Sequence, residues 1–408
     1  MAMKIVADQN IPFVEACFSS IGQVEAVSGR GIGPRVVADA DILLVRSVTP
    51  VGPDLLADSK VRFVATATIG FDHVDVDFLR GRHIGFASAP GSNANSAAEY
   101  VIAGLLEVGQ RRNITLEGKS IGIVGVGNVG SRVAKKCTAL GMKVKLNDPP
   151  LQRETGDPKY RPIEELSDCD FITLHTPLTF EGIDRTFHLA DGKFFRSLKA
   201  GTILINTSRG AVVDSPALKL AIKAGRLKAV VLDVWEDEPN IDVKLLEMVD
   251  IATPHIAGYS LDGKIAGMIM IYQAACKHFS LETKYQINDF LPEPAVGQLT
   301  INPRGEPEQQ VLHRAVNKIY RITEDDRKLR QLADVPTERR GEFFDGLRRN
   351  YPVRREFQNT TVLLATESAE AEAEKMDSSL RGNDMLRAET IAGKLAGIGF
   401  RVADEQKQ

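Results

Sequence analysis

Three polar residues follow short apolar runs in the middle of the chain, and their types suit acid–base chemistry. Arg209 follows the run 203–206, Glu238 follows 230–234 and His255 follows 251–252. A carboxylate beside an imidazole orients the ring and stabilises its charged form, so the ring can exchange a proton with a hydroxyl group. An arginine can hold a carboxylate and polarise an adjacent carbonyl. Taken singly, each residue equally fits a structural role, as a surface ion pair, a turn residue or a hydrogen-bonding partner at a strand end.

The elements that must position these residues are strands alternating with amphipathic helices. Apolar runs of strand length occur at 4–7, 41–47, 61–68 and 83–88, and then at 121–127, 143–148, 170–176, 202–208, 229–235 and 250–255. Strands separated by helical segments predict parallel sheets with helices on both faces, the α/β doubly wound (Rossmann-like) class. Because ligands bind outside the carboxyl ends of such strands, we expect Arg209, Glu238 and His255 to converge on one crevice.

The two series of strands predict two domains, and a third follows. Helical spacing at 92–112 and again at 260–279 predicts two long connecting helices. We therefore expect a discontinuous substrate domain, 1–98 with 260–290, and a nucleotide-binding domain, 99–259. The more charged remainder, 291–408, has helical periodicity at 307–333 and a strand-like run at 360–366, so a small α+β domain is expected. Within it, the polar segment 367–389 has the composition of an inserted solvated helix followed by a polar loop.

A glycine-rich turn between a predicted strand and a predicted helix indicates a dinucleotide site. The spacing G-x-G-x-x-G is formed by Gly125, Gly127 and Gly130, with Asn128 and Val129 at the helix start. Its glycines permit a tight turn, a close approach of backbone to pyrophosphate, and close packing of helix on strand. The next strand ends at Asp148, about 20 residues on, where a carboxylate binds the ribose hydroxyls. Because that carboxylate repels a 2′-phosphate, the pattern predicts NAD in preference to NADP.

The composition excludes several other functions. The chain has 408 residues, of which 43% are hydrophobic, enough for two or three cores. A formal net charge of −3 gives no general attraction to nucleic acid or anionic membranes. The four cysteines lack CxxC spacing, which argues against a metal site and fits a reducing compartment. Neither a signal peptide nor a membrane-spanning run is evident, so we expect a cytoplasmic protein.

The chain resembles the D-2-hydroxyacid dehydrogenases over about residues 3–290. The resemblance is carried by the glycine motif, by Arg209-Gly210 followed by Val213-Asp214, and by Glu238-Pro239 and Pro254-His255. It implies an NAD-dependent dehydrogenase in which Arg209, Glu238 and His255 are catalytic. Further contacts to NAD are implied at Asp148, Thr176, Thr207, Asp233 and Gly258.

Other segments are similar to one subgroup of that family, which acts on a phosphorylated four-carbon 2-hydroxy acid in vitamin B6 biosynthesis. They include 43–51, 65–75, 90–101 and 347–357. The similarity implies a homodimer formed by the C-terminal domain, with Ser47, Thr68 and Tyr259 on the substrate. From the residues alone, Tyr259 fits packing and substrate binding equally well. For the phosphate we expect Arg46 with the backbone amides of 47–49, and we hypothesise help from Arg348 and Arg349 of a dimer partner.

Two alternatives remain open. A sister dehydrogenase acting on another 2-hydroxy acid, such as 3-phosphoglycerate, would use the same catalytic residues. A non-enzymatic NAD-sensing scaffold would use the same fold to bind partner peptides.

Overall fold

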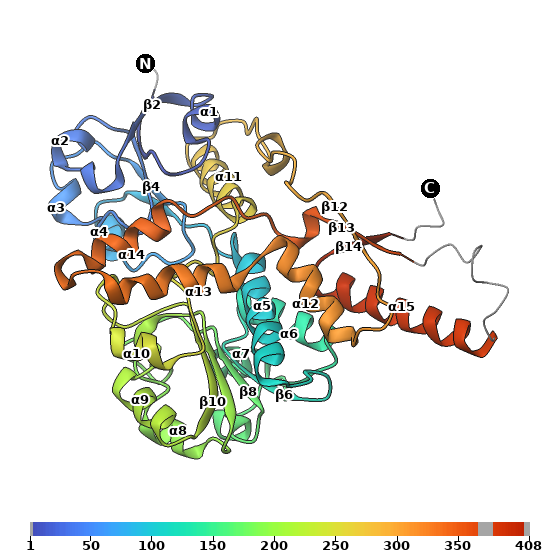
Figure 1. Ribbon diagram of the computed structural model, residues 1–408. Coiled ribbons are helices and arrows are strands. Elements are labelled where there is room, and N and C mark those ends of the chain that lie inside the picture. The colour runs from blue at the N-terminus through green and yellow to red at the C-terminus, as the bar shows by residue number, and fades with distance from the viewer. Residues whose placement is uncertain (1–2, 366–377, 404–408) are drawn as a thin grey trace. The chain divides into compact units, whose positions relative to one another are not determined.

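The computed structural model describes residues 3–365 and 378–403 and divides into two compact units. The first unit consists of residues 1–95 with 259–293, and the second of 96–258 with 294–408. Both are built on parallel sheets (Figure 1), so the predicted α/β class is confirmed. Within the described ranges, no helix combines the length and the apolar character needed to cross a bilayer.

The first unit contains a parallel sheet in the order β2-β1-β3-β4-β5. Its strands are β1 (Met3–Asp8), β2 (Gly22–Val27), β3 (Ile42–Val45), β4 (Phe63–Thr66) and β5 (Gly85–Ala87). One face packs against α1 (Val14–Phe18) and α11 (Leu261–His278). The other face packs against α2 (Pro34–Val37), α3 (Pro53–Leu56) and α4 (Val76–Gly81). The apolar runs of these strands therefore face two layers of helices.

The strand β2 lies outside the apolar runs that predicted the other strands. It forms the edge of the sheet, next to β1. Gln23 and Glu25 are exposed, whereas Val24 and Ala26 are half-buried. A short edge strand with one polar face carries few apolar residues, so its sequence gives a weak signal.

The second unit contains a larger parallel sheet in the order β11-β10-β9-β8-β6-β7. Its strands are β6 (Ser120–Val124), β7 (Lys143–Asn147), β8 (Phe171–Leu174), β9 (Thr202–Asn206), β10 (Leu227–Leu232) and β11 (Ile251–Ala252). Its helices are α5 (Ala94–Arg112), α6 (Asn128–Ala139), α7 (Pro149–Thr155), α8 (Gly192–Ser197), α9 (Ser215–Lys223) and α10 (Val243–Met248). Because β7 and β8 flank β6, the strand order reverses at β6, where doubly wound sheets bind their ligands.

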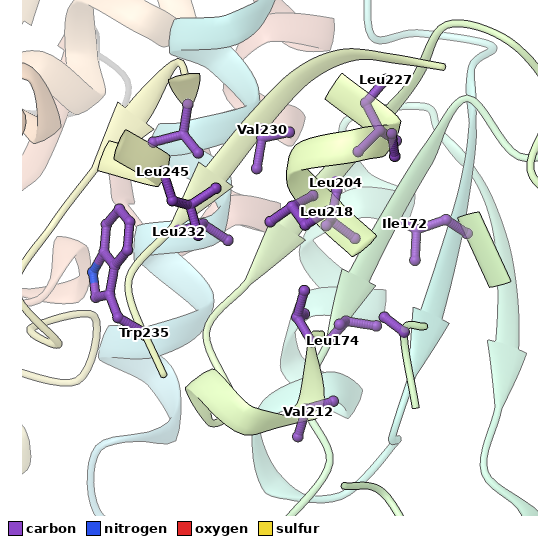
Figure 2. Packing of buried hydrophobic residues seen from close by; sticks show 14 of the residues in the cluster. Ile172, Leu174, Leu204, Val212, Leu218, Leu227, Val230, Leu232, Trp235 and Leu245 are labelled. Carbon is purple, nitrogen blue, oxygen red and sulfur yellow. The ribbon is translucent and has the colours of Figure 1, made fainter. Parts of the chain in front are cut away.

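Alternate side chains of this sheet pack on opposite faces. Figure 2 shows one face, where Leu204, Val230 and Leu218 of α9 belong to one buried cluster and the indole of Trp235 lies beyond the end of β10. Trp235 is 4% exposed, and its Nε1 donates to the Thr253 carbonyl at 3.0 Å. On the other face, α5 approaches Val231, whose Cγ1 would lie 3.6 Å from a Cβ at Gly104. The sheet is thus covered on both sides, as the doubly wound class requires.

The C-terminal part of the second unit has a small sheet of its own. Its parallel strands, in the order β12-β13-β14, are β12 (Gln298–Ile301), β13 (Thr361–Leu364) and β14 (Arg401–Ala403). The accompanying helices are α12 (Glu308–Ile319), α13 (Ile322–Arg330), α14 (Arg340–Arg349) and α15 (Ser378–Ile398).

The polar segment 367–389 lies partly outside the described residues. Nothing is described for 367–377, but 378–389 form the beginning of α15. The polar loop expected at the end of this segment is therefore wrong. The later turns of α15 bury Ile391, Leu395 and Ile398. Adding a turn to a helix that is already anchored costs far less than starting one, which allows polar residues to continue the helix.

Candidate active site

The imidazole of His255 and the carboxylate of Glu238 form the centre of the candidate site. His255 Nδ1 lies 2.7 Å from Glu238 Oε2, and Glu238 Oε1 accepts a hydrogen bond of 2.8 Å from the Trp235 N–H. Burial raises the pKa of Glu238, but the charge of His255 and these two hydrogen bonds outweigh it, so the pKa lies below its usual range. Glu238 therefore stays ionised and holds the imidazole by Nδ1.

The loop that carries His255 is held by Asp233 at the end of β10. The His255 N–H donates to the Asp233 carbonyl at 2.7 Å. Asp233 Oδ1 accepts hydrogen bonds from Thr253 Oγ1 (2.6 Å) and the Ile256 N–H (2.8 Å), and Oδ2 accepts one from the Ala257 N–H (2.9 Å). His255 has φ 57°, a left-handed conformation that costs a non-glycine residue about 1–2 kcal/mol. The surrounding hydrogen bonds must hold it there.

Arg209 follows β9, the strand that pairs with β10. Its Nη1 donates to the Ser208 carbonyl at 2.8 Å. The next residue, Gly210, abuts the backbone that leads to Glu238, because a Cβ at Gly210 would lie 1.9 Å from the Trp235 carbonyl carbon and oxygen. The three predicted catalytic residues thus follow three neighbouring strands, and His255 is in direct contact with Glu238. This close backbone approach at Gly210 was not predicted, although the Arg-Gly pair after a strand could have indicated it.

The glycine turn has the geometry that its spacing predicted. Gly125 has φ 86°, and a Cβ there would lie 2.8 Å from the His175 carbonyl carbon. A Cβ at Gly130 would lie 1.9 Å from the Gly125 oxygen, so α6 packs directly on the turn. By contrast, nothing lies within 4 Å of a Cβ position at Gly127. That open backbone stands at the start of α6, where helix N–H groups attract an anion.

Asp148 is tied to this turn by both carboxylate oxygens. Oδ2 accepts a hydrogen bond of 2.7 Å from the Val126 N–H, between the first two glycines. Oδ1 accepts one of 3.0 Å from the Leu151 N–H and thereby caps α7. The carboxylate that would bind a ribose therefore also fixes the backbone that would bind a pyrophosphate. The ribose contact of Asp148 stays a prediction, and its hydrogen bond with the Val126 N–H was not predicted.

Three further residues lie beside the turn, after β8 and β9. The hydroxyl of Thr176 is buried and has no hydrogen-bond partner within the described part of the chain. Thr207 Oγ1 lies 3.0 Å from His175 Nδ1, and Thr173 Oγ1 lies 2.9 Å from His175 Nε2. Burial lowers the pKa of His175 to about 3, so its ring is neutral. An unpartnered buried hydroxyl, an open glycine and a fixed carboxylate together suit a bound dinucleotide. Of the other predicted contacts, Asn128 and Val129 open α6, and Gly258 follows the His255 loop.

The predicted substrate residues Arg46, Ser47 and Thr68 follow β3 and β4 in the first unit. Arg46 Nε donates to Asp8 Oδ2 at 3.0 Å, and Asp8, at the end of β1, is fully buried. Ser47 is exposed, whereas Thr68 Oγ1 donates to the Gly70 carbonyl at 2.8 Å. Because β1, β3 and β4 are neighbours, these residues share one edge of the first sheet. Asp8, which partly neutralises Arg46, was not predicted.

The remaining candidates are an aromatic ring and two arginines. The ring of Tyr259 makes a cation–π contact with Lys264, whose Nζ lies 4.7 Å from the ring centroid. Arg348 and Arg349 form the last turn of α14. The charge of Arg348 contributes to lowering the pKa of Glu238. The help that Arg348 and Arg349 of a dimer partner would give to phosphate binding stays a prediction. No His, Cys, Asp or Glu cluster suited to a metal ion occurs in the described residues.

Comparison with known proteins identifies the family. Residues 92–257 match the family described as D-isomer specific 2-hydroxyacid dehydrogenase, NAD binding domain. An erythronate-4-phosphate dehydrogenase from Escherichia fergusonii is 45% identical over 368 residues, which cover 90% of this chain and 96% of that protein. The enzyme of the same name from Shigella boydii shows the same identity and coverage. This chain belongs to the erythronate-4-phosphate dehydrogenase family.

A solved relative supports the fold. The crystal structure of D-lactate dehydrogenase from Aquifex aeolicus complexed with NAD and lactic acid has a TM-score of 0.57 and 25% sequence identity. The match covers 68% of this chain and 95% of the D-lactate dehydrogenase chain. Residues 290–376 match a separate domain of unknown function, DUF3410. The resemblance to D-2-hydroxyacid dehydrogenases and the prediction of an NAD-binding domain are thus confirmed, while the boundaries of the three expected domains stay predictions.

Proposed function

We propose that this protein oxidises the C2 hydroxyl of 4-phospho-D-erythronate to (R)-3-hydroxy-2-oxo-4-phosphooxybutanoate. The observation that carries the proposal is the 2.7 Å contact between His255 and an ionised Glu238 at the edge of a sheet with a dinucleotide turn. The 45% identity to erythronate-4-phosphate dehydrogenases supports the choice of substrate. The reaction would serve vitamin B6 biosynthesis, and the expected location is the cytoplasm.

The proposed mechanism gives each residue one task. NAD, when bound, accepts the hydride that leaves C2. Nε2 of His255 takes the proton of the C2 hydroxyl as the carbonyl forms. Glu238 stabilises the resulting imidazolium through Nδ1, and Arg209 binds the substrate carboxylate. General-base assistance of this kind accelerates a reaction by about 10²- to 10⁴-fold.

We propose that NAD is held by the glycine turn and the residues around it. The turn and the start of α6 would receive the pyrophosphate, and Asp148 the ribose. The hydroxyls of Thr176 and Thr207, with the backbone at Gly258, would lie along the nicotinamide side. Both carboxylate oxygens of Asp233 bind the His255 loop, so we assign Asp233 the task of holding that loop. Its predicted contact with NAD would be secondary.

For the substrate phosphate we propose Arg46, together with the backbone amides that follow it. Because Asp8 already binds Nε of Arg46, the remaining guanidinium nitrogens would have to contact the phosphate. Thr68 and Tyr259 would contact the rest of the substrate. A homodimer formed through the C-terminal domain remains our proposal.

The test is an assay of NADH formation with a panel of acids. The panel contains 4-phosphoerythronate, erythronate, 3-phosphoglycerate and lactate, each with NAD and with NADP. We expect the highest kcat/KM for 4-phosphoerythronate with NAD. A higher value for 3-phosphoglycerate would identify a sister dehydrogenase instead. Turnover of none of the four acids, with NAD still bound, would favour the scaffold alternative.

A further inference from the structure

A charged stretch near the C-terminus is buried to an unusual degree. Arg354 is 6% exposed, Arg355 9% and Glu356 4%, and the next residue, Phe357, is 1% exposed. Charged side chains are rarely this buried unless they are paired or hydrogen-bonded. None of these residues belongs to the catalytic set, so their burial requires an explanation.

The stretch is fastened to the first turns of α5. Ser96 Oγ donates to Glu356 Oε1 at 2.7 Å. The backbone N–H of Phe357 donates to Glu99 Oε1 at 3.0 Å. The two bonds join residues that are 260 and 258 positions apart in the chain. Residues 356 and 357 are therefore fixed relative to α5, which restricts where the neighbouring Arg354 can lie.

Arg354 reaches from this stretch to the end of the His255 loop. Its Nη2 donates to the Ala257 carbonyl at 2.6 Å and makes a longer contact of 3.4 Å with the Ser96 carbonyl. The guanidinium carbon lies 4.3 Å from the centre of the Tyr320 ring, a cation–π contact that fixes its plane. The Ala257 carbonyl belongs to the same residue whose N–H binds Asp233. Both polar groups of Ala257 are thus held, one by β10 and one by the C-terminal stretch.

We infer that Arg354 is a positioning residue for His255. The left-handed backbone of His255 persists only while both sides of its loop are fixed, since it would otherwise relax to a cheaper conformation. Asp233 fixes the loop from one side, and Arg354 fixes the Ala257 carbonyl from the other. The C-terminal part of the chain would in this way set the direction of the imidazole. This inference rests on the proposed role of His255 as the base.

The expected effect is on chemistry more than on cofactor binding. If the Ala257 carbonyl is released, His255 can shift relative to Glu238 and to the substrate hydroxyl. A misplacement of about 1 Å can reduce the rate about 10²-fold. The glycine turn is held by different contacts, at Asp148 and α6, so it should keep its geometry.

The experiment compares Arg354→Met with Arg355→Met in the full-length chain. Both replacements remove a buried guanidinium from the same stretch, but Arg355 Nη2 donates to Asn359 Oδ1 (2.8 Å), whereas Arg354 Nη2 donates to the Ala257 carbonyl of the His255 loop. We expect Arg354→Met to lower kcat about 10- to 100-fold. The Kd for NAD should stay within about 3-fold of the wild-type value, a change no larger than the loss of one hydrogen bond would cause. Arg355→Met should keep kcat near the wild-type value. Arg354→Lys retains the charge and should recover part of the loss, even if the methionine variant folds poorly.

A second measurement does not depend on the substrate. We expect the proton shared by His255 Nδ1 and Glu238 to give a downfield NMR resonance, which would be assigned by its disappearance in His255→Gln. This resonance should broaden or move upfield in Arg354→Met and stay unchanged in Arg355→Met. An unchanged resonance, or equal losses of kcat in both variants in proportion to their melting temperatures, would overturn the inference. If the wild-type protein does not oxidise 4-phosphoerythronate, the proposed function fails, yet the NMR comparison still decides whether Arg354 positions His255.

Discussion

Replacing Asp148 with alanine should destabilise the protein before any cofactor is added. In the folded chain the carboxylate accepts hydrogen bonds from the Val126 N–H (2.7 Å) and the Leu151 N–H (3.0 Å). The second bond caps α7, and loss of such a cap costs about 1 kcal/mol. The first is a charge-assisted bond to a buried residue, and its loss costs about 1.5–3 kcal/mol. The free energy of unfolding should therefore fall by about 2–4 kcal/mol, or about 5–10 °C in melting temperature.

The same replacement should alter cofactor choice in a specific way. Removing the carboxylate ends the repulsion of a 2′-phosphate, which favours NADP. It also releases the N–H of Val126, so the turn that receives the pyrophosphate loses its anchor for both cofactors. The ratio of Kd values for NADP and NAD should therefore shrink mainly because NAD binds more weakly. A large gain in NADP affinity is not expected.

Thermal unfolding of the cofactor-free protein and titration with each cofactor test this reasoning. Asp191→Ala is the matched control, because Asp191 likewise caps a helix, α8, through the Phe194 N–H (2.8 Å). Asp148→Asn should keep the cap of α7 but lose the bond to Val126. Its melting temperature should therefore lie between those of Asp191→Ala and Asp148→Ala. If Asp148→Ala is no less stable than Asp191→Ala, the carboxylate does not hold the turn. If the cofactor ratio is unchanged, Asp148 does not face the ribose.

Four other perturbations have defined outcomes. His255→Ala should lower kcat at least about 10²-fold in the NADH assay, while calorimetry shows NAD binding within a few-fold of wild type. Gly210→Ala should lower both melting temperature and kcat, since its Cβ would lie 1.9 Å from a backbone carbonyl. Arg46→Met should raise KM for 4-phosphoerythronate much more than for erythronate, and equal changes would place the phosphate elsewhere. Burial raises the pKa of Cys17 and of Cys137 to about 12, so both are protonated thiols at lower pH. Mass spectrometry after iodoacetamide at pH 8 should therefore find them labelled only in unfolded protein.

Local patterns predicted the parts of the fold that depend on short stretches of sequence. Buried parallel strands are largely apolar, so each of the ten expected runs overlaps a strand of the two large sheets. The glycine spacing was equally informative, because the motif marks the three positions of the turn that lack a side chain. Gly125 and Gly130 leave no room for a Cβ, and Gly127 leaves its surroundings open.

Contacts between distant residues left no such pattern. Arg354 and Ala257 are 97 positions apart, and neither their types nor their spacing indicates that they meet. The pairing of Arg46 with Asp8 depends on the order of β1 and β3 in the sheet, which apolar runs do not determine. The same holds for the double duty of Asp148, since a strand-ending carboxylate can be recognised without knowing which N–H groups it binds. The sequence thus indicated candidate residues for the chemistry, but it did not indicate the contacts that hold these residues in place.

The divided first unit has a consequence for synthesis on the ribosome. Its last strand, β5, ends at Ala87, but α11, which covers one face of its sheet, begins only at Leu261. The ribosome adds about 5–20 residues per second, so the intervening stretch takes roughly 10–30 s to make. During that time Ile5, Ile42 and Leu44 lack the helix that buries them. We therefore expect chaperones that shield apolar surface to bind a nascent chain of this length. Slow translation before residue 261 should increase aggregation and lower the yield of folded protein.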